Sequence, residues 1–179
     1  LSEISCVAVD NGPGLFTGLR VGVASGKAIA QALRVPMITV SSLDLLAFPL
    51  RYTNRRIAAV IDARRSEVFW ALYQPVPGGV QRVSEPRVGT PDDLAAELLA
   101  LPGETLLAGD GSVRYADLLV GRSGIELAGG DHVHPSARSL VQLAHAKALR
   151  EEWIRPHQVE LLYLRKPDAE INWSVREGA

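Results

Sequence analysis

Residues 11–33 read NGPGLFTGLRVGVASGKAIAQAL, with five glycines and one proline in the first sixteen positions. The stretch follows the apolar run ISCVAV, residues 4–9, which is typical of a short strand buried in a sheet. Thr17 is a suitable helix N-cap, and a helix rarely continues through the residue before Pro36. The sequence therefore predicts a strand, a glycine loop and a helix that runs from about Thr17 to Arg34.

The glycine loop lacks the common phosphate-binding signatures. A Walker loop needs Ser or Thr after Gly-Lys, but Ala28 follows Gly26 and Lys27, and Val21 stands where the first glycine belongs. The glycine spacing of a dinucleotide-binding loop is also missing. Because a helix N-terminus attracts anions, phosphate binding by this loop stays open as a hypothesis.

Four small residues fall on one side of the expected helix, at every fourth position: Gly18, Gly22, Gly26 and Ala30. Each interior glycine costs about 1 kcal/mol relative to alanine, so this ridge needs a packing reason. Two interpretations remain: close packing on the protein's own sheet, or a docking face for a helix of another protein. The apolar residues flanking the ridge are Leu19, Val23, Ala24 and Ile29.

The rest of the chain alternates between strand and helix patterns. The expected strands cover residues 36–40, 56–62, 66–74, 79–88, 104–109 and 125–128, with a final extended segment at 159–165. The expected helices cover residues 41–50, 90–101, 112–120 and 136–153. Three successive strands followed by alternating elements indicate an α/β protein with a mixed sheet.

Composition sets the outer limits on function. The 179 residues carry a formal net charge of -1 and are 47% hydrophobic, so no overall basic field favours nucleic acid. No apolar run reaches the roughly 18 residues of a membrane span, and the single Cys6 lies in an apolar run, so we expect a cytoplasmic protein with one structural thiol. The chain starts at Leu1 and enters a strand almost at once, which suggests that it begins inside a fold.

Residues with catalytic chemistry are sparse. The histidines, at positions 132, 134, 145 and 157, include no pair at the i,i+4 spacing of a helical metal motif. Asp131, His132 and His134 form either a metal site or ordinary polar surface. A phosphotransferase needs acids for magnesium and as a base, and Asp10 and Asp62 are the only candidates at expected strand ends.

A second polar cluster, in the DARRSE stretch, has two readings. Asp62, Arg64, Arg65 and Glu67 suit surface ion pairs at a turn. Alternatively, the Arg64 guanidinium reaches a partner or a nucleotide phosphate.

Several segments resemble the bacterial TsaB (YeaZ) family, in family order and over nearly the whole chain: GPGLFTGLRVGVASGKAIAQALRVPMITVSSLDLLA (12–47), AVIDARRSEVFWALY (59–73), AGDG (108–111) and LLYLRKPDA (161–169). The chain departs from the family pattern at Leu15, usually serine, and at Ser66, usually glycine. This family is a paralogue of the TsaD/Kae-type proteins. The resemblance implies the actin-like ATPase fold of sugar kinases and Hsp70, with mixed sheets flanked by helices but without the family's N-terminal strands. Residues 1–55 would be the remainder of the N-terminal subdomain and 56–179 the C-terminal subdomain, with the last helix packing back on the first.

The same resemblance implies a noncatalytic scaffold or partner subunit. It would act with TsaD, joined by a TsaE-type ATPase, in threonylcarbamoylation of the adenosine beside the anticodon, and would meet tRNA only through that complex. The expected partner interface is Gly18, Leu19, Gly22, Val23, Gly26, Ile29 and Ala30. Alone, the protein would form a homodimer through residues 17–33.

No metal or cofactor of its own is expected, although ATP or ADP at the complex interface would meet Arg64 and Glu67. An independent ATPase or sugar-kinase-like phosphotransferase is the alternative. An RNA-binding module, a third reading, would need a basic stripe with aromatic residues, whereas the arginines here are scattered among acids.

Overall fold

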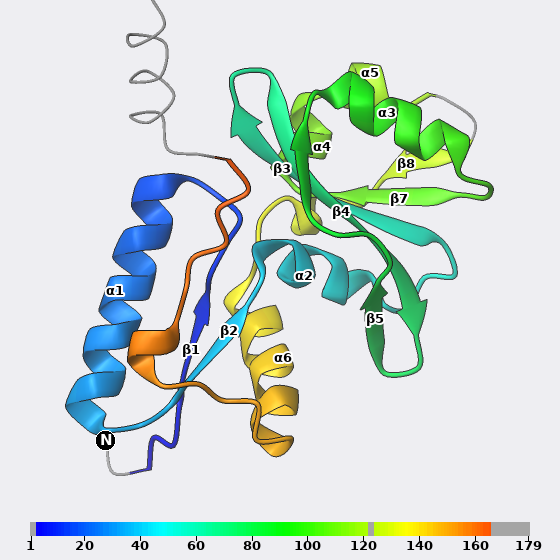
Figure 1. Cartoon of the computed structure of the whole chain (residues 1–179). Coiled ribbons are helices and arrows are strands. Elements are labelled where there is room, and N and C mark those ends of the chain that lie inside the picture. The colour runs from blue at the N-terminus through cyan, green and yellow to red at the C-terminus, as the bar shows by residue number, and fades with distance from the viewer. Residues whose placement is uncertain (1–2, 122–123, 166–179) are drawn as a thin grey trace, which may run out of the picture.

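Two four-residue strands, β1 (Val7–Asp10) and β2 (Met37–Val40), pair in parallel at the centre of a first lobe (Figure 1). In this computed structural model, which describes residues 3–121 and 124–165, helices cover both faces of the pair. Alternate side chains of a strand point to opposite faces. Val9 and Met37 therefore pack with helix α1 (Phe16–Leu33), and Ile38 and Val40 pack with α6 (Ala137–Leu149).

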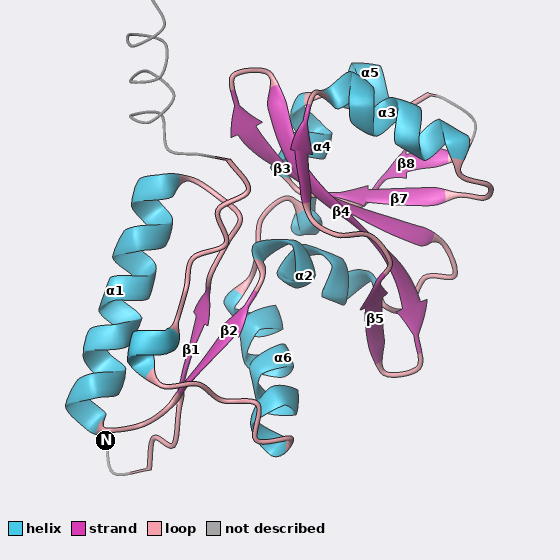
Figure 2. Cartoon of the chain, in the orientation of Figure 1, coloured by secondary structure: helices cyan, strands magenta, loops and turns pink. Residues whose placement is uncertain are grey.

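The second lobe is a mixed sheet in the strand order β5-β4-β3-β7-β8, with β6 also paired to β4 (Figure 2). Its strands are β3 (Arg56–Arg64), β4 (Glu67–Val76), β5 (Gly79–Arg82), β6 (Arg87–Gly89), β7 (Thr105–Ala108) and β8 (Ile125–Leu127). β3 is antiparallel to β4 and parallel to β7. The helices α3 (Pro91–Ala100), α4 (Asp110–Arg114) and α5 (Ala116–Leu119) belong to this lobe. α3 and α5 contribute to the core on one face of this sheet.

The short helix α2 (Ser42–Ala47) belongs to the cores of both lobes. Ser41 caps it by accepting a hydrogen bond from the Leu43 N–H, and a turn of 3₁₀ helix, η1 (Phe48–Leu50), follows. Leu45 packs with the first-lobe core, whereas Leu43 and Leu46 pack with the second. Because its buried residues lie in both cores, α2 joins the lobes at a fixed point.

The chain returns to the first lobe after β8. The 3₁₀ turn η2 (Gly130–His132) precedes α6, which contacts β2, β1 and α2. Ile154 then forms a single bridge to Met37, and a third 3₁₀ turn, η3 (Pro156–Gln158), leads into a loop segment, residues 159–165. Strands β1 and β2, from the expected N-terminal subdomain 1–55, thus pack with α6, from the expected C-terminal subdomain 56–179.

The predicted α/β class with a mixed sheet flanked by helices is confirmed, but several boundaries differ. Pro86, which has no backbone N–H, lies in the gap where the expected strand 79–88 divides into β5 and β6. The expected helix at 112–120 is two short helices that meet at Tyr115, whose φ of -110° is not helical. α6 ends at Leu149, not residue 153, because Glu151 adopts a left-handed φ of 57°.

Two other predictions concern the ends of the chain. The expected final extended segment, residues 159–165, forms no strand: it joins no ladder, the Tyr163 N–H bonds the Leu161 carbonyl at 3.1 Å, and the chain bends at residues 164–165. Residues 166–169 of the LLYLRKPDA motif lie outside the described part. Cys6 is half-buried beside the first-lobe core. Among the described residues, no helix is both long and apolar enough to cross a membrane.

Candidate functional site

The loop after β1 is held by a carboxylate. Asp10 Oδ1 accepts a hydrogen bond from the Gly12 N–H at 2.8 Å, and the Ser42 hydroxyl donates to both Asp10 oxygens at 2.7 and 2.8 Å. Burial raises the pKa of the Asp10 carboxyl above its ordinary value, more than these two donors lower it. Asp10 therefore ties the glycine loop to α2, and its acceptor oxygens already have partners within the chain.

Helix α1 starts two residues earlier than the expected N-cap at Thr17 predicts. Its N-cap is Leu15, which has no side-chain capping bond, and Phe16 is the first helical residue. Its first turn holds no acidic residue, so the N–H groups of that turn keep their partial positive charge. At the other end, Arg34 takes the left-handed cap conformation with φ 57°.

The glycine ridge of α1 divides into two halves. A Cβ atom on Gly26 would lie 2.4 Å from Val9 Cγ1, whereas one on Gly18 or Gly22 would meet nothing within 4 Å. Val23 and Ala30 are buried in the first-lobe core together with Val9. The ridge therefore needs a correction: its second half packs on the protein's own sheet, and only its first half faces outward.

The outward side of α1 carries small or apolar residues and no charge. Val21 and Ile29 are 61% and 51% exposed, and Gly18, Gly22, Ala24, Ser25 and Ala28 are exposed beside them; Leu19, half-buried, contacts the glycine loop instead. The only charged residues of the helix are Arg20 and Lys27. Both bond the C-terminal segment, Arg20 Nε to the Tyr163 hydroxyl at 3.0 Å and Lys27 Nζ to the Val159 carbonyl at 2.8 Å, although Arg20 itself is exposed. We call the exposed side the α1 outer face.

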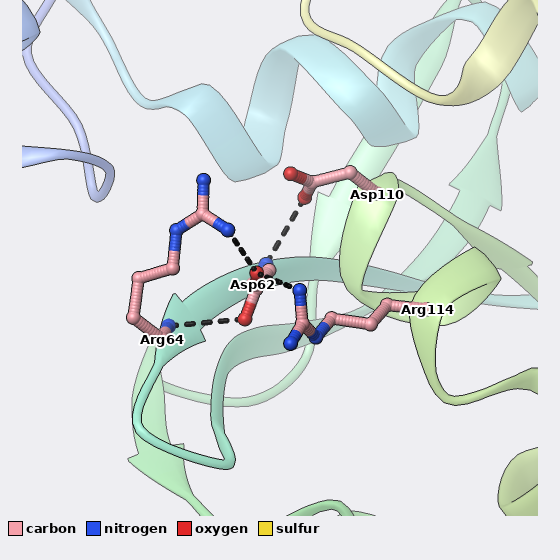
Figure 3. Close-up of polar contacts among 4 residues, drawn as sticks. All are labelled: Asp62, Arg64, Asp110 and Arg114. Carbon is pink, nitrogen blue, oxygen red and sulfur yellow. Dashed lines mark hydrogen bonds and ion pairs between the residues drawn. The ribbon is translucent and has the colours of Figure 1, made fainter.

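Two arginines, Arg64 at the β3–β4 hairpin and Arg114 at the end of α4, contact the buried carboxylate of Asp62 (Figure 3). Asp62, 7% exposed, accepts bonds from the Arg64 N–H and guanidinium at 3.0 and 3.2 Å, and the Arg114 guanidinium lies 3.5 Å away. The Asp62 N–H donates to Asp110 Oδ1 at 3.0 Å. Because Asp62 is already shared by two guanidiniums, both arginine side chains are held near the surface of the second lobe.

The tip of this hairpin is conformationally strained. Arg64, Arg65 and Ser66 have φ values of 62°, 54° and 59°, a region that costs a residue with a side chain about 1 kcal/mol or more. Arg64 pairs with Glu67, so Arg65 and Ser66 form a two-residue turn in which both φ values are positive. This geometry explains why glycine suits the position of Ser66.

A cleft of about 680 Å³ separates the start of α1 from this hairpin. Its walls are residues 14–18 of the first lobe, residues 63–65 and Phe69 of the second, and residues 162–165 of the C-terminal segment. The charged residues of this lining are Arg64, Arg65 and Arg165, with no carboxylate among them. The Arg165 guanidinium donates a hydrogen bond to Glu67 at 2.7 Å. Glu67, expected from sequence to contact a nucleotide or a partner, thus fixes the position of a cleft-lining arginine. Arg64 and Arg165 are paired with Asp62 and Glu67, and without a carboxylate in its lining the cleft has no ligand set for a metal ion.

The DHVH stretch does not assemble a metal site. Over residues 3–121 and 124–165, no group of three His, Cys, Asp or Glu side chains is placed to hold a metal ion. His132 is instead the last residue of η2, and its carbonyl accepts the Gly109 N–H at 2.8 Å. The loop therefore braces the end of β7.

Sequence reasoning missed Ser42, Arg114, Tyr163 and Arg165 as members of these constellations. Ser42 lies 32 residues from Asp10, and Arg165 lies 98 residues from Glu67. No local spacing signals such pairs, because the two-lobed fold brings them together.

The sequence and the fold of this chain are similar to those of known proteins. Residues 1–116 match the sequence model of the TsaD family, described as tRNA N6-adenosine threonylcarbamoyltransferase. The chain is 32% identical to the Escherichia coli protein named tRNA threonylcarbamoyladenosine biosynthesis protein TsaB, over 99% of this chain and 77% of that protein. The Haemophilus influenzae protein of the same name is 27% identical, over 99% of this chain and 76% of that one.

A solved structure shares the fold as well. The crystal structure of a Pseudomonas aeruginosa protein, described as similar to peptidase YEAZ, superposes with a TM-score of 0.79 at 32% identity, over 92% of this chain and 75% of that one. The molecule is thus an α/β protein of the YeaZ structural type. It belongs to the TsaB/YeaZ family, which is related to TsaD.

Proposed function

We propose that this chain is a noncatalytic partner subunit in threonylcarbamoylation of the adenosine adjacent to the anticodon of tRNA, and that it acts by binding a TsaD-type protein. The pathway is that of the name carried by its E. coli relative. The observation that carries the proposal is the α1 outer face, an exposed apolar helix surface without a charged residue. Such surfaces mark protein interaction sites.

Two features of the α1 outer face suit a helix as its partner. Gly18 and Gly22 have open space where a side chain would be, so a second backbone can approach closely. Val21 and Ile29 provide exposed apolar area beside them. Of the interface predicted from sequence, Gly18, Gly22 and Ile29 lie on the α1 outer face and would contact the partner. Val23, Gly26 and Ala30 instead pack on the first-lobe sheet.

The strand-end acids favour this role over the phosphotransferase alternative. Asp10 is bonded to Ser42 and Gly12, and Asp62 is shared by Arg64 and Arg114, so both carboxylates have partners within the chain. A phosphotransferase needs carboxylates that are free to hold magnesium or to act as a base. In this proposal the chain has no cofactor of its own, and ATP or ADP at the complex interface would meet the cationic cleft lining, Arg64 included.

The remaining parts of the proposal follow from the family resemblance. The chain would adopt the actin-like ATPase fold, work in the cytoplasm and join a TsaE-type ATPase in the complex. It would reach tRNA indirectly, through TsaD, and would form a homodimer when no partner is present.

The proposal is tested by reconstituting tRNA modification from purified full-length proteins with and without this one. We expect modification to fall to background when it is left out, and the protein alone to hydrolyse ATP at the background rate. Robust ATP turnover by the isolated protein, lost in Asp10→Asn or Asp62→Asn, would instead support the phosphotransferase alternative.

A further inference from the structure

The C-terminal segment, residues 159–165, runs beside α1 toward the second lobe (Figure 1), and its residues 162–165 line the cleft. We call it the strap. Its first half is anchored in the first lobe, where Val159 is 4% exposed in the core and Leu161 packs beside it. Its last two residues belong with the second lobe: Leu164 packs against that core, and Arg165 pairs with Glu67.

Polar contacts fix the strap along the way. The Asn11 side chain donates to the Glu160 carbonyl at 3.2 Å, and the Leu162 N–H donates to the Asn11 carbonyl at 2.8 Å. Near the start of α1, the Tyr163 ring lies 5.7 Å from that of Phe16. The Arg20 guanidinium lies 3.8 Å above the Phe16 ring while it bonds the Tyr163 hydroxyl. The strap is therefore attached to the loop and the helix that form the first-lobe wall of the cleft.

The position of the strap relative to α2 gives it a mechanical role. α2 is buried in both cores, so it is the point about which the lobes would rotate. The chain passes between the lobes after α2 and again between β8 and α6, and the strap adds a further connection, whose residues 162–165 form part of the cleft lining. A hinge with a further connection across its opening cannot widen unless one end of that connection is released.

We propose that the strap is a tether that sets the angle between the lobes and hence the width of the cleft, and that its weaker end is at Leu164 and Arg165. The Arg165 and Glu67 side chains are only partly buried, at 25% and 33% exposed, and Leu164 is partly buried against the second-lobe core. Val159, by contrast, is almost fully buried. Opening of the cleft therefore releases the second-lobe anchor and leaves the first-lobe anchor in place.

The chain contains its own matched control. Leu149 and Arg150 repeat the Leu-Arg dipeptide on α6, where Leu149 is 74% exposed and Arg150 pairs with Glu152 beside it, within one lobe. The test compares Leu164→Ala/Arg165→Gln with Leu149→Ala/Arg150→Gln in the full-length protein. Both carry Cys6→Ser and spin labels at two exposed positions, Gln31→Cys on α1 and Gln81→Cys on β5.

Pulsed electron paramagnetic resonance then measures the distance between the lobes. We expect the strap variant to broaden the distance distribution at least twofold, while the control variant keeps the wild-type distribution. Equal distributions in all three proteins, or the same broadening in the control, would overturn the proposal.

If the strap variant does not fold, Glu67→Gln removes the ion pair from the hairpin side and leaves Leu164 in place. This variant should give a smaller broadening of the same distribution. A wild-type distribution in Glu67→Gln would then count against the tether.

Discussion

At the scale of single residues, two glycines of the same helix have opposite roles. Gly22 has no neighbour where a side chain would be, whereas a side chain on Gly26 would collide with Val9. A sequence pattern cannot separate them, because both occupy the same i+4 ridge. Only the position of β1 behind the helix distinguishes the glycine that packs internally from the one that faces outward.

This difference predicts opposite changes in stability. Gly22→Ala should raise the free energy of unfolding by up to about 1 kcal/mol, because alanine is the better helix former and nothing obstructs it. Gly26→Ala should lower that free energy by about 1–3 kcal/mol, because the added methyl forces the helix away from β1. Urea unfolding of the two variants checks this. A loss of stability in Gly22→Ala would mean that the first half of the ridge is also packed internally.

Asp10 predicts a particular dependence of stability on pH. Burial raises the pKa of this carboxyl in the folded state, so between its ordinary value of 3.8 and the raised one the folded protein binds more protons than the unfolded chain. The free energy of unfolding should therefore fall as the pH rises through that window, and then level off.

Asp10→Asn removes this titration while keeping a side chain of the same shape. In urea unfolding at several pH values, the wild type should lose stability relative to Asp10→Asn as the pH increases from 3.5 to 7. A difference between the two proteins that is independent of pH would show that Asp10 is as well solvated when folded as when unfolded.

At the scale of elements, α1 shows how a helix separates support from recognition. Arg20 and Lys27, the charged residues of α1, donate hydrogen bonds to the strap, and neither belongs to the α1 outer face. An apolar outer face is costly to leave in water, at about 25 cal/mol per Å². A two-fold pairing of two copies is the commonest way to cover such a face.

We therefore expect a concentration-dependent homodimer of the isolated protein, measured by sedimentation equilibrium. Val21→Arg should make it monomeric by placing a charge in the middle of the α1 outer face. Val141→Arg on α6 is the matched control, since the two valines are 61% and 65% exposed. A dimer that survives Val21→Arg, or that Val141→Arg disrupts, would place the contact elsewhere.

The elements themselves were largely predictable from sequence. The helix α3 has a Thr90–Asp93 capping box and Pro91 in its first turn, all local signals, and it forms as expected. The breaks at Pro86 and Tyr115 were missed because strand and helix periodicity continues across them. The inward turn of Val23, Gly26 and Ala30 and the partners of Asp10 and Asp62 depend on segments distant in sequence, for which local periodicity carries no information.

At the scale of the whole molecule, the two lobes share one helix in their cores and a strap across their cleft. The cleft has a largely apolar lining with three arginines, while the adjacent α1 outer face carries no charged residue. In the proposed complex, the partner protein binds the α1 outer face, and the cleft then lies next to that partner. The proposed partner role therefore depends most on whether a TsaD-type protein binds the α1 outer face.

The most direct test is the affinity of the full-length protein for its TsaD-type partner, measured by isothermal titration calorimetry for the wild type, Val21→Arg and Val141→Arg. We predict that Val21→Arg weakens binding about 100-fold, or roughly 2.8 kcal/mol, because a buried unpaired charge would separate the two helices. Val141→Arg should bind as the wild type does. Unchanged affinity in Val21→Arg, in a protein that still unfolds like the wild type, would contradict the account.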